Sequence, residues 1–223
     1  MTNPLIASSA YVDVTARLSP DVVVGEQASI RQGVTLGYGT HVGARTCIGR
    51  DSSIGAGVEI GPDVRIGESV LVMEGALICP NEVESNSTDA RTLQDKVVIG
   101  RGVLLHDEVE LGNGAIVPNQ RTIACLGHLG GKGRMLTVYG SDTGPRYSVG
   151  CRLGINYDAL VQSVEENIST TPESAQTYVP YLGILDQIGT VVQAAYNSSG
   201  AAVAELKSLR AALLARSIRN ARS

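Results

Sequence analysis

The most regular feature of the chain is an aliphatic residue at every sixth position over its first third. The series has no gap, and its members are Ile6, Val12, Leu18, Val24, Ile30, Leu36, Val42, Ile48, Ile54, Ile60, Ile66, Val72 and Ile78. Neither a helical period of about 3.6 nor a strand period of about 2 generates this spacing, so the pattern indicates an internal repeat. The series breaks at Glu82 and resumes with Ile99, Leu105, Leu111 and Val117.

Each six-residue unit also constrains its other positions. We number the units from the aliphatic residue, position one; position five is then small or β-branched, as Ser52 and Val58 are, and position two is often Gly. Positions five and one of adjoining units are two residues apart, so on an extended strand both side chains face the interior. Position six lies between them and faces outward, as for Arg17 and His41. Positions two to four must turn a corner, where Gly adopts a positive φ without steric cost.

Short strands and corners at fixed spacing predict a solenoid, in which neighbouring coils bury each other's apolar residues. The pattern resembles the hexapeptide-repeat family, and this resemblance implies a mainly β fold, a left-handed parallel β-helix with three units per triangular coil. The 13 + 4 = 17 units predict five to six coils within residues 1–125. Residues 83–96 are polar and acidic, and we expect them to form a loop at one corner.

The hexapeptide rhythm ends after Val117, and two further regions follow. Residues 126–153 contain a glycine-rich loop and two short β-type segments, 136–139 and 146–149, which predict a β-hairpin. Residues 154–223 predict helices, with apolar stripes starting at Tyr157 and Tyr181, a start signal at Thr171-Pro172, a turn at 197–200 and a last helix with a basic end. These stripes fit docking on the chain's own β-helix or on a neighbouring protein. The basic end predicts a solvated helix face or, alternatively, a surface for an acidic partner.

Composition limits the binding partners and cellular locations to be expected. The 223 residues are 43% hydrophobic, enough for one elongated core with appendages. A formal charge of −4 argues against general nucleic-acid binding. We expect no membrane association, because no segment has the pattern of a signal peptide or of a membrane span. The four cysteines show no pairing signature, which predicts reduced thiols and a cytoplasmic location.

The family resemblance implies two activities, and the first is acyl transfer from acetyl-CoA or another acyl-CoA to a small polar acceptor such as a sugar. Apolar units, a loop and then Val97-Val98-Ile99-Gly100 match the layout of the sugar acetyltransferases. The general base that this resemblance requires would be His106, with Asp107 fixing its tautomer. Cofactor phosphates would be held by a glycine-rich cationic segment that includes Gly130, Gly131, Lys132 and Arg134.

The second implied activity is that of gamma-class carbonic anhydrases, which hold a metal with three histidines at a subunit interface. The segment Val72–Cys79 matches the frame that precedes a histidine ligand, but Met73 and Cys79 stand where Gln and His are expected. Only His106 follows at a ligand position. Cys79 and His106 are therefore weak metal candidates, and carbonic anhydrase activity is not expected.

Structural roles fit the same residues, which leaves a non-catalytic alternative open. The histidines His41, His106 and His128 and the thiol of Cys79 each suit a surface or packing role. The alternative is a trimeric scaffold or assembly protein, a degenerate homologue of gamma carbonic anhydrase. In either case the helix stripes and the apolar position-six residues predict a homotrimer; these residues are Val23, Leu71, Leu77 and Leu104. The C-terminal helices also offer a surface for a protein partner.

Overall fold

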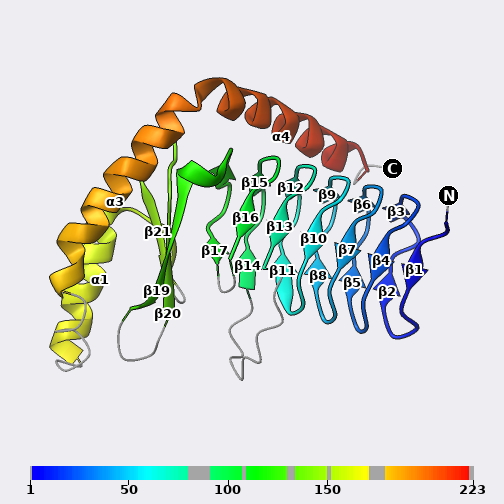
Figure 1. Cartoon of the computed structure of the whole chain (residues 1–223), viewed down its shortest axis with the longest axis horizontal. Helices are drawn as coiled ribbons and strands as arrows, with labels where there is room; N and C mark the ends of the chain where they lie inside the picture. The colour runs from blue at the N-terminus through cyan, green and yellow to red at the C-terminus, as the bar shows by residue number, and fades with distance from the viewer. Residues whose placement is uncertain are drawn as a thin grey trace.

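The computed structural model describes residues 2–79, 91–106, 109–129, 134–149, 152–170 and 179–220. Its longer part is a solenoid of six coils built from three parallel sheets of six short strands each (Figure 1). Sheet A contains β1 (Leu5–Ile6), β4 (Val23–Val24), β7 (His41–Val42), β10 (Glu59–Ile60), β13 (Leu77–Ile78) and β16 (Leu104–Leu105). Sheet B contains β2 (Tyr11–Val12), β5 (Ser29–Ile30), β8 (Cys47–Ile48), β11 (Val64–Ile66), β14 (Arg91–Leu93) and β17 (Glu110–Leu111). Sheet C contains β3 (Arg17–Leu18), β6 (Thr35–Leu36), β9 (Ser53–Ile54), β12 (Leu71–Val72), β15 (Val98–Ile99) and β18 (Ile116–Val117).

The strand register confirms three hexapeptides per coil. Leu5 pairs with Val23 and Ile6 with Val24, which is a separation of 23 − 5 = 18 residues. Position-one and position-five side chains fill the bore, and from Val22 onward nearly all of them are buried. The predicted parallel β-helix of five to six coils is therefore confirmed, while its left-handed winding stays an implication of the resemblance.

The corners show why the repeat uses glycine, and the reason differs from the expected one. In the solenoid, positive φ angles occur at position four, where Asp51 (φ 56°) and Arg45 (φ 58°) adopt them without being glycine, and at Cys79. Where position two is Gly, the residue is needed for close approach between coils instead. A Cβ on Gly49 would lie 2.4 Å from the carbonyl oxygen of Gly67 in the next coil. Small size, rather than backbone freedom, is what position two selects.

The corner loop is shorter than predicted. Arg91–Leu93 forms β14, which pairs with β11 and β17 inside sheet B, so the expected loop at 83–96 is wrong at its C-terminal end. Ile66 pairs with Leu93, 27 residues later, and 27 − 18 = 9 residues are inserted into this coil. The inserted segment lies between Ile78 and Arg91, and the hexapeptide register continues directly after it.

A four-stranded antiparallel sheet, sheet D, closes the C-terminal end of the solenoid. After the short 3-10 helix η1 (Gln120–Thr122), its strands are β19 (Ile123–Leu129), β20 (Arg134–Tyr139), β21 (Arg146–Val149) and β22 (Arg152–Ile155), in that order. The predicted hairpin is confirmed as β20 and β21. On the solenoid side, the backbone amide of Gly112 donates to the hydroxyl of Tyr139 at 3.1 Å, which fastens the sheet to the last coil.

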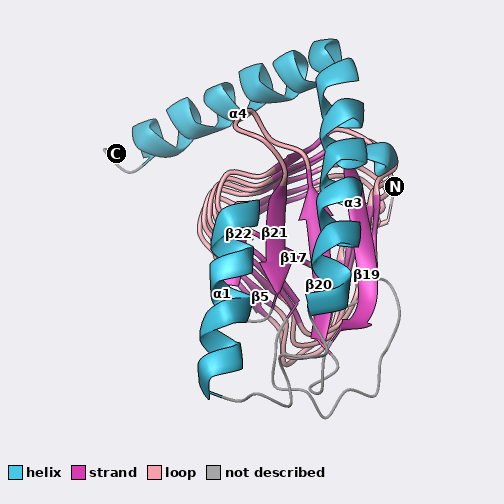
Figure 2. Ribbon diagram, turned by 90° about the vertical axis from the view of Figure 1, so that its left-hand side faces the viewer, coloured by secondary structure: helices cyan, strands magenta, loops and turns pink. Residues whose placement is uncertain are grey.

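Two helices, α1 (Tyr157–Thr170) and α3 (Val179–Ser198), cover sheet D (Figure 2). Leu160 of α1 and Leu185 of α3 pack against Leu136, Val138 and Tyr147 of the sheet. The predicted start signal at Thr171-Pro172 lies outside the described residues. Helix α3 ends at Ser198, and Ser199, within the predicted turn, separates it from the next helix.

The last helix, α4 (Gly200–Asn220), runs back along the solenoid toward its N-terminal end (Figure 1). Val203 and Leu206 of α4 and Tyr196 of α3 pack on Val98 and Ile116 of sheet C. Of the two expected roles for the apolar stripes, docking on the chain's own solenoid is therefore the one observed. None of the helices within the described ranges combines the length and hydrophobicity needed to cross a membrane.

Candidate functional site

The corner that follows sheet A brings Cys79 and His106 together. The two residues occupy position two in successive coils, where the earlier coils have Gly25, Gly43 and Gly61. The backbone amide of Cys79 donates to the carbonyl of Leu105 at 2.8 Å, and its thiol donates to the carbonyl of His106 at 3.1 Å. Cys79 also has a left-handed backbone (φ 46°), and the inserted segment of this coil begins directly after it. The corner is thus a stacked pair, with a buried thiol below and a histidine above.

His106 is held through its backbone, while its side chain is exposed. On one side its carbonyl accepts the bond from Cys79. On the other side Cys125 of β19 contacts the backbone amide of His106, and burial raises the pKa of the Cys125 thiol to about 11. A thiol with this pKa is protonated at neutral pH and is a poor nucleophile. Cys125 therefore has a packing role, and the imidazole of His106 is the reactive group that this corner presents.

Several other predicted site residues cannot be placed. Asp107, Gly130, Gly131 and Lys132 lie outside the described residues, and Arg134 is described only as the first backbone position of β20. The backbone of His128 belongs to β19. The structure does show that β19 passes His106 at Cys125, and that β19 and β20 are the strands on either side of residues 130–133.

The described part of the chain contains no cluster of side chains that could hold a metal ion. Among those residues no three His, Cys, Asp or Glu side chains gather closely enough to hold an ion. Cys79 is 1% exposed, and its thiol is donating to the backbone. A zinc ligand would have to be a thiolate, so Cys79 and His106 stay weak candidates. Cys47, Cys79 and Cys125 are all free thiols, as predicted for reduced cysteines.

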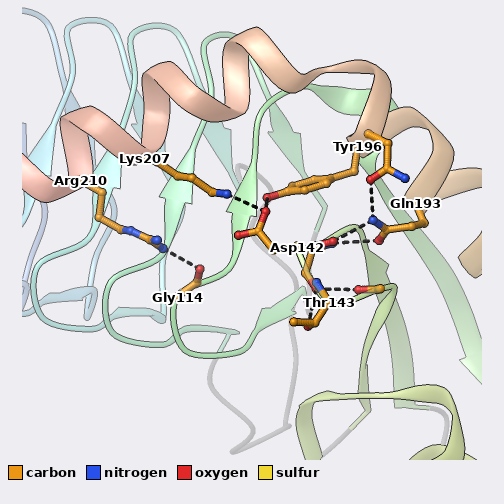
Figure 3. A network of polar contacts seen from close by, with 10 residues as sticks. Gly114, Asp142, Thr143, Gln193, Tyr196, Lys207 and Arg210 are labelled. Carbon is orange, nitrogen blue, oxygen red and sulfur yellow. Dashed lines mark hydrogen bonds and ion pairs between the residues drawn. The ribbon is translucent and has the colours of Figure 1, made fainter.

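The basic end of α4 forms specific contacts, contrary to the expected solvated face. Lys207 Nζ donates to Asp142 Oδ1 at 2.6 Å, and Tyr196 donates to the same oxygen at 3.3 Å (Figure 3). The hydrogen bond from Lys207 lowers the pKa of Asp142 below its usual range. Arg210 Nη1 donates to the carbonyl of Gly114 at 2.8 Å. These bonds tie α4 to sheet D and to the last coil of the solenoid.

A cavity of about 650 Å³ lies under the C-terminal half of α4, at the corner between sheets B and C. Arg216 and Arg219 of the helix line it together with Arg17 of β3 and Asp51. From the sequence, Arg17 is recognisable only as an outward residue of its strand. The basic residues of the last helix are also visible there, but their proximity to Arg17 depends on the antiparallel path of α4.

Comparison with known proteins gives similarity of fold only. No family model and no curated protein matches the chain. Among solved structures, a GDP-perosamine N-acetyltransferase variant from Caulobacter crescentus in complex with CoA and GDP-perosamine is 18% identical over 52% of each chain, with a TM-score of 0.23. A hexapeptide transferase family protein from Anaplasma phagocytophilum is 22% identical over 79% of this chain and 93% of its own, with a TM-score of 0.27. LpxA from Acinetobacter baumannii is 16% identical over 80% and 96% of the two chains, with a TM-score of 0.27.

The repeat and the strand register decide the architecture. The chain has the hexapeptide-repeat β-solenoid fold. It spans about half of the length of the perosamine acetyltransferase. Identities and TM-scores this low carry no argument about the reaction, so the function has to be argued from the residues of this β-solenoid.

Proposed function

We propose that this β-solenoid protein is an acyltransferase that moves an acyl group from coenzyme A to a small polar acceptor such as a sugar. The observation that supports this most is the corner at His106. Its backbone is anchored on both sides by Cys79 and Cys125, while its imidazole is open to solvent and to a substrate. A general base needs this combination of fixed position and access.

The proposed chemistry is a direct transfer. His106 removes the proton from the acceptor hydroxyl or amine as that atom attacks the thioester carbonyl. The carbon–sulfur bond breaks, and the leaving thiolate of coenzyme A takes up the proton, so that the products are the acylated acceptor and free coenzyme A. Asp107, Gly130, Gly131, Lys132 and Arg134 keep their proposed roles, the first in orienting the imidazole and the others in holding the cofactor phosphates.

The test compares two exposed histidines of the same solenoid. We expect His106→Ala to lower acyl-CoA turnover ~10²–10⁴-fold, the usual contribution of a general base. His41→Ala is the matched control, because His41 is also exposed but lies on β7 of sheet A, three strands away from β16, which leads into His106. Free coenzyme A is quantified by chromatography over a panel of sugar and amine acceptors. Unchanged turnover in His106→Ala would refute the assigned role.

A second candidate, a non-catalytic trimeric assembly protein, is favoured by the outer face of sheet A. Val23, Leu77 and Leu104 point outward there and are only partly covered, and Leu5 is 69% exposed. His41 and Glu59 lie between Val23 and Leu77, so the apolar residues form two groups on this face. Such groups suit contact with further copies of the chain. We expect a homotrimer by light scattering at micromolar concentration under either proposal. A trimer that turns over no acyl-CoA with any acceptor would favour the second candidate. The free thiols agree with the expected cytoplasmic location.

A further inference from the structure

The cavity under α4 has features of a binding site that the proposed reaction does not use. It lies between the first coils of the solenoid and the C-terminal half of the helix, at the opposite end of the solenoid from His106. Ser217 Oγ donates to Asp51 Oδ2 at 2.8 Å, which holds the helix over the cavity. Its volume of about 650 Å³ falls within the usual range for small-molecule pockets.

The described lining of the cavity is net positive. Among the described residues, three arginines and one carboxylate line it, which gives a formal charge of 3 − 1 = +2. The Nε and Nη2 atoms of Arg216 are buried and have no hydrogen-bond partner. Buried donors without acceptors are costly, and charged ones more so. An anion bound in the cavity beside Arg216 would offset the cost of burying this charge.

The uncharged residues of the lining indicate what kind of ligand would carry the anionic group. Thr15, Gln32 and Thr35 contribute hydroxyl and amide groups, and the described lining residues include no aromatic or aliphatic side chain. A large apolar group of a ligand would therefore lie against polar side chains. A ligand that is polar throughout, with hydroxyl groups for Asp51 and Gln32, fits this surface.

The cavity also depends on one backbone position. Gly33 has a φ of 69°, and a Cβ built on it would lie 2.4 Å from Asp51 Oδ1. The absence of a side chain at Gly33 therefore leaves the space in which the Asp51 carboxylate sits. The same carboxylate is placed where it can both hold Ser217 and accept a hydrogen bond from a ligand hydroxyl.

We propose that this cavity binds a small phosphorylated sugar, with Arg17, Arg216 and Arg219 on its phosphates and Asp51 and Gln32 on its hydroxyls. Guanidinium groups bind phosphate through paired, charge-assisted hydrogen bonds, and three arginines give each phosphate of a bisphosphate at least one guanidinium partner. The site is independent of acyl transfer at His106.

Calorimetric titration of the full chain at low salt tests the proposal. The probes are fructose 1,6-bisphosphate, pyrophosphate, citrate and unphosphorylated fructose. We expect one bisphosphate per chain, bound at least ~10-fold more tightly than pyrophosphate or citrate, and no binding of fructose. Equal affinity for citrate would overturn the assignment to phosphate, and no heat with any phosphate would overturn the site. Because the readout is binding, its failure is distinct from a failure of the proposed turnover.

Variants locate the site. Arg219→Gln removes an exposed cation and should fold normally, and we expect it to weaken bisphosphate binding ~10-fold. Arg216→Gln should weaken it further. Arg65→Gln is the matched control, because it removes an exposed cation from sheet B and should leave binding unchanged. Wild-type affinity in Arg219→Gln and Arg216→Gln would contradict the proposal.

Two further outcomes separate the alternatives. Asp51→Asn should weaken the bisphosphate, which loses a hydroxyl partner, and strengthen pyrophosphate, which loses a repulsive charge. If both ligands bind more tightly, the sugar assignment is wrong. If no phosphate binds and the arginine variants lower the oligomeric mass, the cavity is filled by a neighbouring subunit and the proposal is wrong.

Discussion

Helix α4 lies on two different halves of sheet C. Over the last three coils the outward residues of the sheet are Leu71, Val98 and Ile116; the helix buries Val98 and Ile116 and leaves Leu71 partly exposed. Over the first three coils the corresponding residues are Arg17, Thr35 and Ser53, and part of the contact is a cavity. The strands of sheet C pair in parallel in the same way in both halves. The outward residues of the strands therefore determine whether the helix packs tightly on the sheet or leaves a cavity above it.

The two halves also differ in how their polar groups are paired. Near the apolar half, Lys207 and Arg210 bind Asp142 and the carbonyl of Gly114. In the polar half, Arg216 keeps two buried nitrogens unpaired. The first arrangement stabilises the helix, whereas buried donors without acceptors reduce the stability of the second. Three changes of decreasing size test this contrast.

The largest effect is expected from Leu206→Ala in the apolar half. Leu206 is 5% exposed against sheet C, and its truncation should lower the free energy of unfolding by about 2–4 kcal/mol through lost burial and a residual cavity. Chemical denaturation followed by circular dichroism measures it. Leu209→Ala is the control on the same helix, since Leu209 is 37% exposed and should cost well under half as much. Equal costs would mean that the apolar half does not hold the helix.

Substitution of two arginines that lie six residues apart on α4 should change the free energy of unfolding in opposite directions. Without ligand, Arg216→Met should raise the free energy of unfolding by about 1 kcal/mol, because it removes two unpaired buried donors and keeps the apolar stem. Arg210→Met should lower it by about 1–2 kcal/mol, because the bond to Gly114 is lost. The same denaturation experiment compares them. A loss of stability in both variants would show that Arg216 is satisfied in solution.

The smallest effect concerns pH and the Lys207–Asp142 pair. Both side chains are partly exposed, so the pair should contribute less than about 1 kcal/mol. The folded pKa of Asp142 lies below its ordinary value of 3.8, so this contribution is present above about pH 4 and is lost as pH falls through the lowered pKa. Asp142→Asn should lack this step in a series of denaturation curves between pH 3 and 6. A step that persists in the variant would assign it to another carboxylate.

The bore of the solenoid was predictable because it repeats. Each buried aliphatic residue sits at a fixed spacing, and the three-unit coil follows from the pairing of strands 18 residues apart. The strand at Arg91–Leu93 was missed, although Leu93 lies six residues before Ile99 and Val97 fills position five. The glycine that often marks position two is absent after Leu93, because Gln94 occupies that position.

The site was less predictable, for a physical reason. His106 could be proposed from its place in the repeat, but the contact of Cys125 with its backbone depends on the path of β19. The arginine cavity depends on the direction in which α4 crosses the solenoid, which places Ser217 beside Asp51, 166 residues earlier in the chain. No local pattern encodes a meeting of such distant segments. The apolar stripe of the helix predicts that the helix docks on another surface, but it does not predict the direction in which the helix runs.

The late position of α4 in the chain has a consequence for biosynthesis. Val98 and Ile116 are made well before Val203 and Leu206, the residues that cover them. A solenoid grows by adding one coil to the previous one, so its first coils are able to form while the helix is still being translated. During that interval sheet C presents a bare apolar strip on a nascent chain, a natural target for chaperones and for premature association. Arrival of the helix ends that exposure, and the same event assembles the arginine cavity.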